Sequence, residues 1–110
     1  MKKGTIATVA MLSISLFATS AFCDTKKGEK VDGKAEFEKH CAACHPNGGN
    51  VSNPQKTLSK AVMAKNGVKS QKDIIAKMRN PGPGMTKFDA KTVPDKEAKA
   101  IADYILKTFK

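Results

Sequence analysis

Residues 41–45 read Cys41-Ala42-Ala43-Cys44-His45, two cysteines separated by two residues and followed directly by a histidine. This arrangement is the attachment signature of c-type haem. Positions three apart lie on one face of a helix, so the sulfurs of Cys41 and Cys44 can both reach the vinyl groups at one edge of a porphyrin. The imidazole of His45 can then act as the proximal ligand of the iron. The pentapeptide therefore predicts one haem c, attached covalently through Cys41 and Cys44.

A Cys-x-x-Cys pair has two other common uses, and the rest of the sequence favours neither. A redox dithiol of the thioredoxin type needs a strand–helix context, and the sequence shows no pattern of parallel strands. A structural zinc site needs four ligands. No Cys or His follows His45, and only Cys23 and His40 precede the motif. Haem attachment is the favoured interpretation, and a dithiol or an adventitious metal site remains as the alternative.

The length of 110 residues allows one domain, and residues 1–23 have the pattern of a secretory signal peptide. Lys2 and Lys3 precede a mostly apolar run, and small residues follow it. The run is too short and too rich in Ser and Thr to favour a membrane-spanning helix. Residues 24–110 would then form the mature domain, which we expect in the periplasm. A domain of this size builds a marginal core, and a buried haem would supply the missing apolar bulk.

Cys23 is the cysteine outside the haem motif, and its fate has two interpretations. Ala21-Phe22-Cys23 fits the small-x-small pattern before a signal-peptidase cleavage site, so that the thiol is lost on cleavage. Alternatively, Cys23 becomes a lipid-modified N-terminal residue that anchors the protein to a membrane. Simple cleavage is favoured because Phe22, directly before Cys23, is not small.

The chain is strongly basic, with a formal net charge of +10. Without Lys2 and Lys3, 18 basic residues remain against 10 acidic ones, and all but one of the basic residues are lysines. This balance is consistent with a well-solvated surface. It also fits electrostatic steering toward redox proteins with acidic docking surfaces or toward an anionic membrane face. Nucleic acid is disfavoured as a partner because lysine lacks the bidentate fork with which arginine reads bases. We expect a monomer.

The pattern of apolar and turn-forming residues predicts an all-α fold without strands or repeats. We expect helices over residues 33–43, from Ser59 to Asn66, from Ser70 to the residue before Pro81, and from Pro94 or Asp95 to the end of the chain. The last of these carries the clearest apolar stripe, made of Ala98, Ile101, Ala102, Ile105 and Phe109. Loops rich in Pro, Gly and Asn are expected after the haem motif and around residues 81–84.

The second axial ligand of the iron separates an electron carrier from a ligand-binding haem protein. His40 lies on the motif helix itself and cannot reach the far side of the porphyrin, so we expect it at the surface or flanking the haem. Met78 fits the apolar stripe of its helix, and Met63 lies in a short helix. Met85 follows a Pro/Gly loop, which can hold a thioether against the iron at low entropic cost. Met85 is therefore the predicted sixth ligand.

One set of residues spans nearly the whole mature chain: Gly33, Phe37, the motif Cys41–His45, Gly48-Gly49-Asn50, Lys56-Thr57-Leu58, Gly84-Met85, Phe88, and Ile101, Tyr104 and Ile105. In these residues the sequence resembles the class I cytochromes c, and most closely the small cytochrome c6-like group. The resemblance implies about four helices packed around one haem. It also implies a crossing of the N- and C-terminal helices at which Gly33 permits close approach. In the family a proline carbonyl usually orients the proximal histidine, and Pro54 is the nearest candidate here. The family's methionine is commonly followed by proline, whereas Thr86 follows Met85.

These observations predict an electron-transport protein rather than an enzyme. It would be a one-electron carrier that cycles between Fe(III) and Fe(II) with His45 and Met85 bound, and redox proteins would dock at its haem edge. A gas-binding or sensor haem protein with an open or weakly held sixth site is the alternative. A peroxidase would need a distal acid–base residue, and His40 is the only other histidine. A structural or copper-handling secreted protein would purify without covalent haem.

Overall fold

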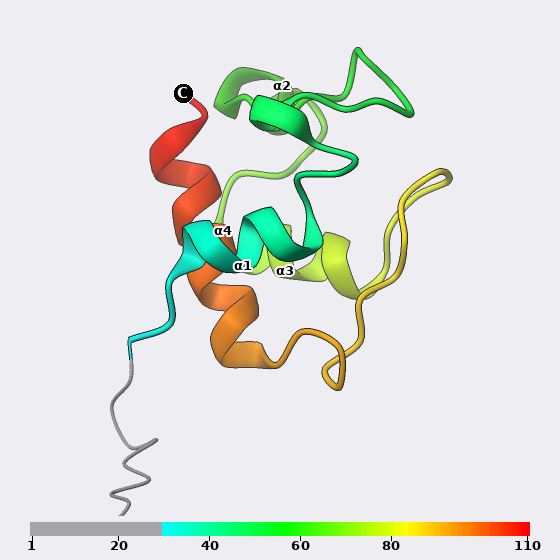
Figure 1. Cartoon of the computed structure of the whole chain (residues 1–110). Helices are drawn as coiled ribbons and strands as arrows, with labels where there is room; N and C mark the ends of the chain where they lie inside the picture. The colour runs from blue at the N-terminus through cyan, green and yellow to red at the C-terminus, as the bar shows by residue number, and fades with distance from the viewer. Residues whose placement is uncertain (1–29) are drawn as a thin grey trace, which may run out of the picture.

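The computed structural model describes residues 30–110 and shows a small bundle of helices (Figure 1). The predicted signal peptide and Cys23 lie outside this range. The elements follow one another as α1 (Gly33–His40), the 3-10 helix η1 (Pro46–Gly48), α2 (Lys60–Lys65), α3 (Gln71–Arg79) and α4 (Asp95–Thr108). Residues 30–110 contain no strand. The prediction of an all-α fold with about four helices is confirmed.

Helix α1 is shorter than the sequence predicted. It begins after Asp32, whose carboxylate accepts hydrogen bonds from the backbone N–H groups of Lys34 and Ala35. It ends at His40, so the haem motif lies in the turns that follow the helix and not within it. The backbone N–H of His45 nevertheless donates to the carbonyl of Cys41 at 2.8 Å. This helical turn keeps the motif compact, as the spacing of the two thiols requires.

The predicted crossing of the first and last helices is present. A Cβ atom added to Gly33 would lie 2.1 Å from the carbonyl oxygen of Ala100, so the two backbones approach as closely as only glycine allows. The rings of Phe37 and Tyr104 lie beside this contact with their centroids 5.3 Å apart. Ile101, on the same face of α4, is fully buried. This crossing holds α1, and with it the start of the haem motif, against the core.

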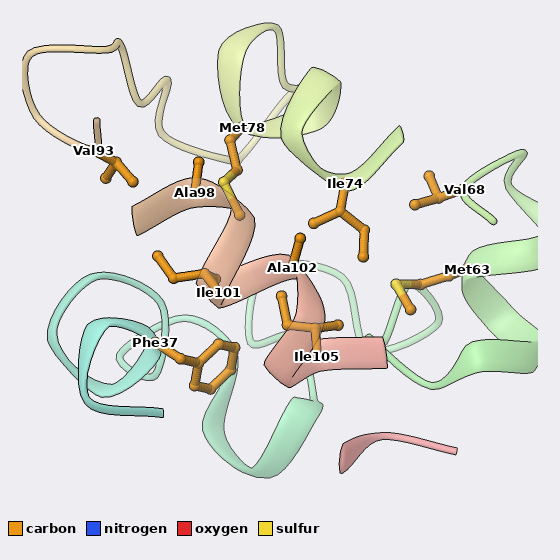
Figure 2. Packing of buried hydrophobic residues seen from close by; sticks show 10 residues of the cluster. All are labelled: Phe37, Met63, Val68, Ile74, Met78, Val93, Ala98, Ile101, Ala102 and Ile105. Carbon is orange, nitrogen blue, oxygen red and sulfur yellow. The ribbon is translucent and has the colours of Figure 1, made fainter. Parts of the chain in front are cut away.

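The core is a single apolar cluster centred on α4 (Figure 2). Ile74 and Met78 of α3 point toward Ala98 and Ala102 of α4. Met63 contributes to the same cluster from α2. The prediction that Met78 packs in the core is confirmed.

Two capping motifs and two long loops complete the fold. Ser59 caps α2, and Ser70 forms a reciprocal capping box with Asp73 at the start of α3, as the sequence predicted. The loop between η1 and α2 and the loop between α3 and α4 project from the same side of the helices (Figure 1). The two are joined by a hydrogen bond of 3.4 Å from the hydroxyl of Ser52 to the carbonyl of Gly84.

Candidate haem-binding site

A cavity of about 380 Å³ lies between the helical core and the two long loops. Cys41, Cys44 and His45 line it from the motif, and Met85 lines it from the loop between α3 and α4. The structure thus brings all four predicted site residues to one cavity, from segments about 40 positions apart in the sequence. The rest of the lining is largely apolar and includes Phe37, Leu58, Met63, Val68, Ile74, Met78, Phe88, Val93, Ile101 and Ile105.

His45 is the buried polar residue of the described chain, with 9% of its surface exposed. Its Nδ1 atom lies 2.7 Å from the carbonyl oxygen of Gly49. A carbonyl oxygen only accepts, so Nδ1 carries the proton and donates, which leaves Nε2 with a free lone pair for a metal. Such a hydrogen bond fixes the orientation of a ligating imidazole and raises its basicity.

The expected role of Pro54 in this contact is wrong, because the acceptor is Gly49. The chain turns sharply after the motif, where Asn47 and Gly48 both adopt positive φ angles of 53° and 78°. This turn brings the Gly49 carbonyl back over the imidazole only four residues after His45. The Asn47-Gly48 pair was the sequence signal for it, because asparagine and above all glycine tolerate such φ angles.

Cys41 and Cys44 are both free thiols on adjacent turns beside the cavity. Cys41 is half-buried, and burial together with the neighbouring Cys44 raises the pKa of its thiol to about 11. Cys44 is exposed, so one edge of the site faces solvent. Covalent attachment of a group at these two thiols would therefore leave that edge accessible to another protein.

Three methionines line the cavity, and their packing separates them. Met63 and Met78 are 6% and 4% exposed and belong to the core cluster. Met85 lies outside that cluster, on a loop, and is only partly buried. Met85 is thus the methionine whose position does not already serve helix packing.

His40 flanks the cavity, which is one of the two positions expected for it. Its side chain is 14% exposed, and its Nε2 atom lies 3.4 Å from a carboxylate oxygen of Glu36. Its ring meets the ring of Phe88 edge-on, with 6.1 Å between centroids. Because His40 is the last residue of α1, it stays on the side of the cavity from which the motif begins.

The rim of the cavity is basic. Lys56 and Lys77 line it, and both are exposed. Val51, in the loop after η1, is the exposed large hydrophobic residue of the described chain, with 61% of its surface accessible. Within residues 30–110 no helix has both the length and the apolar character needed to cross a membrane.

Comparison with known families assigns the class of the protein. A family model described as "Cytochrome C oxidase, cbb3-type, subunit III" matches residues 28–105, most of the chain. The chain belongs to the cytochrome c family, and its helical fold places it with the small class I members. The cofactor of this family is covalent haem c, for which Cys41 and Cys44 supply the two attachment thiols.

Within that family the chain is similar to cytochrome c6. It is 34% identical to cytochrome c6 of Nostoc sp. over 106 residues, which cover 96% of this chain and 93% of that protein. Among solved structures it is similar to outer membrane cytochrome F of Geobacter sulfurreducens, with a TM-score of 0.69 and 42% identity over 71% of this chain and 99% of that one. Cytochrome c6 of the diatom Phaeodactylum tricornutum gives a TM-score of 0.65 and 33% identity over 73% of this chain and 93% of that one. The protein is thus a c6-like electron carrier of the c-type haem class.

Proposed function

We propose that this protein is a periplasmic one-electron carrier whose haem c iron is bound axially by His45 and Met85. The observation that carries the proposal is the convergence of His45 and Met85 on one cavity whose remaining walls are mostly apolar. Haem c supplies a one-electron Fe(III)/Fe(II) couple, and thioether ligation favours the ferrous state. The apolar walls exclude water, and the Gly49 carbonyl holds the imidazole of His45 in one tautomer. A site that keeps its ligands and its shape in both oxidation states suits rapid electron exchange.

The optical spectrum of the purified protein tests this ligation. Sharp ferrous bands of a low-spin c-type haem, with a near-infrared Met-to-iron charge-transfer band in the ferric form, are the expected result. The variant Met85→Ala should lose that band, whereas Met63→Ala should keep it, because Met63 serves the core cluster. A high-spin wild-type spectrum, with rapid binding of carbon monoxide by the reduced protein, would instead support the gas-binding alternative. An unchanged six-coordinate spectrum in Met85→Ala would show that another residue binds the iron.

Electron exchange would take place at the solvent-facing edge near Cys44. Lys56 and Lys77 at the rim would attract a redox protein with an acidic docking surface, and Val51 would provide an apolar contact. Encounters of this kind use small interfaces and dissociate quickly. The exchange rate with an acidic partner should therefore fall as ionic strength rises. A rate that is independent of salt would contradict the steering.

Catalysis is not part of the proposed function. The sequence contains two histidines. His45 is the proposed proximal ligand, and His40 stays with α1 beside Phe88. Neither is therefore available as a distal acid–base residue of the kind that a peroxidase needs.

The location and the state of the N-terminus form a separate part of the proposal. Cleavage after Cys23 would release residues 24–110 as a monomer in the periplasm. Mass spectrometry of the mature N-terminus tests this, and Asp24 is the expected first residue. A diacylglyceryl group on Cys23 would instead place the protein at a membrane surface.

A further inference from the structure

The only arginine in the sequence, Arg79, joins three segments around the base of the Met85 loop. Arg79 is the last residue of α3, and its side chain is 24% exposed. Its Nη1 donates to the carbonyl oxygen of Phe88 at 3.0 Å, at the end of the loop. Its Nη2 lies 2.7 Å from a carboxylate oxygen of Asp95, in the first turn of α4. One guanidinium group thus connects the residue before the loop, the residue that closes it, and the helix that follows.

Phe88 is held at several points, so the base of the loop is well defined. Its backbone N–H donates to the carbonyl of Met78 at 2.9 Å, while its own carbonyl accepts from Arg79. Its ring lies against His40 and lines the cavity. The chain between Arg79 and Phe88 therefore leaves the helical core and returns to it at one place.

Inside the loop the hydrogen bonds are weaker than at its base. The N–H of Met85 lies 3.4 Å from the carbonyl of Gly82, and the hydroxyl of Ser52 lies 3.4 Å from the carbonyl of Gly84. Both distances are beyond the usual range for such bonds. Thr86 follows Met85, so no proline ring stiffens the chain at that point. The position of Met85 then depends largely on the two ends of the loop.

We propose that Arg79 is a positioning residue for Met85. The two hydrogen bonds of the Arg79 guanidinium, here called the fork, fix the base of the loop and thereby oppose withdrawal of the Met85 thioether from the cavity. The proposal rests on the ligation proposed above. A lysine would replace Arg79 only in part, since a single ammonium group cannot present two donors at fixed spacing to Phe88 and Asp95.

The two hydrogen bonds of the Arg79 guanidinium contribute unequally to holding the Met85 loop in place. Asp95 is 77% exposed, and exposed ion pairs add little. The bond to the Phe88 carbonyl is partly buried and has a charged donor, which makes it the stronger of the two. Removing the whole fork should therefore loosen the loop much more than removing the carboxylate of Asp95.

The test is the rate at which added imidazole displaces the sixth ligand of the ferric, haem-loaded protein. Entry of imidazole requires Met85 to withdraw, and loss of the near-infrared charge-transfer band reports it. Arg79→Ala should raise this rate on the order of tenfold, the effect of losing one hydrogen bond with a charged donor. Arg79→Lys should give an intermediate increase, and Asp95→Asn less than roughly threefold. Arg79→Lys keeps the charge and serves as the measured variant where Arg79→Ala fails to assemble.

A control for general destabilisation is Asp32→Ala, which removes the N-cap of α1 far from the loop in sequence. It should lower the urea midpoint of unfolding without changing the rate of imidazole entry. Equal rates in Arg79→Ala, Asp32→Ala and the wild type would overturn the role of Arg79 and leave the proposed function intact. A wild-type protein without the charge-transfer band would instead refute Met85 ligation itself, and the positioning role would fall with it.

Discussion

Replacement of Gly33 by alanine tests the crossing of α1 and α4 most directly. The added Cβ would lie 2.1 Å from the carbonyl oxygen and 2.7 Å from the carbonyl carbon of Ala100. Both atoms belong to the backbone of α4, so no side-chain rotation can relieve the contact. Since ordinary contacts begin at 3.4 Å, the helices must separate locally by more than an ångström. The separation would also disturb the packing of Phe37 against Tyr104.

The size of the effect follows from two opposing contributions. Overpacking of this kind costs typically about 1–3 kcal/mol. Alanine is favoured over glycine in a helix interior by about 1 kcal/mol, and by less at the first residue of α1, where Gly33 lies. We therefore expect the free energy of unfolding to fall by about 2 kcal/mol. In a domain of this size, that fall corresponds to a decrease in Tm of roughly 10 °C.

Urea-induced unfolding of the haem-loaded protein, followed by circular dichroism, measures this change. Gly82→Ala is the matched control, because a Cβ at Gly82 meets nothing within 4 Å and its φ angle is not positive. The control should stay within about 0.5 kcal/mol of the wild type. A Gly33→Ala protein as stable as the Gly82→Ala protein would refute the close approach of the two backbones.

Three further variants test local features by urea or pH-dependent unfolding. Gly48→Ala should cost about 1–3 kcal/mol, because Gly48 has a φ of 78° and a Cβ there would lie 2.5 Å from the ring of Phe109. Ser70→Ala should cost about 1 kcal/mol through loss of the N-cap of α3. The pKa of Asp73 lies below its ordinary 3.8, mainly because its carboxylate accepts a hydrogen bond from the backbone N–H of Lys69 and, second, because it is hydrogen-bonded to Ser70. The stabilisation from Asp73 is therefore complete above pH 3.8 and is lost as the pH falls through the lower folded-state pKa. Asp73→Asn should make the acid limb of the unfolding curve shallower, and an unchanged acid limb would contradict this reasoning.

The elements predicted correctly from the sequence are those whose signals are local. The capping box at Ser70 and the cap at Ser59 mark helix starts within three residues. The apolar stripe of α4 predicts which of its residues are buried, because the stripe repeats with the helical period. The Cys-x-x-Cys-His spacing likewise implies its own geometry, and the structure places both thiols and the imidazole at one cavity.

The features missed by the sequence depend on where distant or strongly turned segments meet. The helix before the motif ends at His40, although the apolar pattern continued through Cys44. The partner of His45 is Gly49 because of a turn with two positive φ angles, which periodicity does not reveal. The flanking position of His40 was expected, but its contact with Phe88, 48 positions further along the chain, was not.

The two sides of the site differ in how their positions are determined, and this difference has a functional consequence. On the His45 side, the imidazole is held by a carbonyl four residues away, within one compact turn. On the Met85 side, the loop depends on Arg79 and Phe88 at its base and on Ser52 across the cavity. Local contacts survive partial opening of a fold better than contacts between distant segments do. Stress by denaturant should therefore release the Met85 side before α1 and α4 separate. With the ligation proposed above, the iron would then lose Met85, and with it the constant coordination that rapid electron exchange needs, while the helices are still folded.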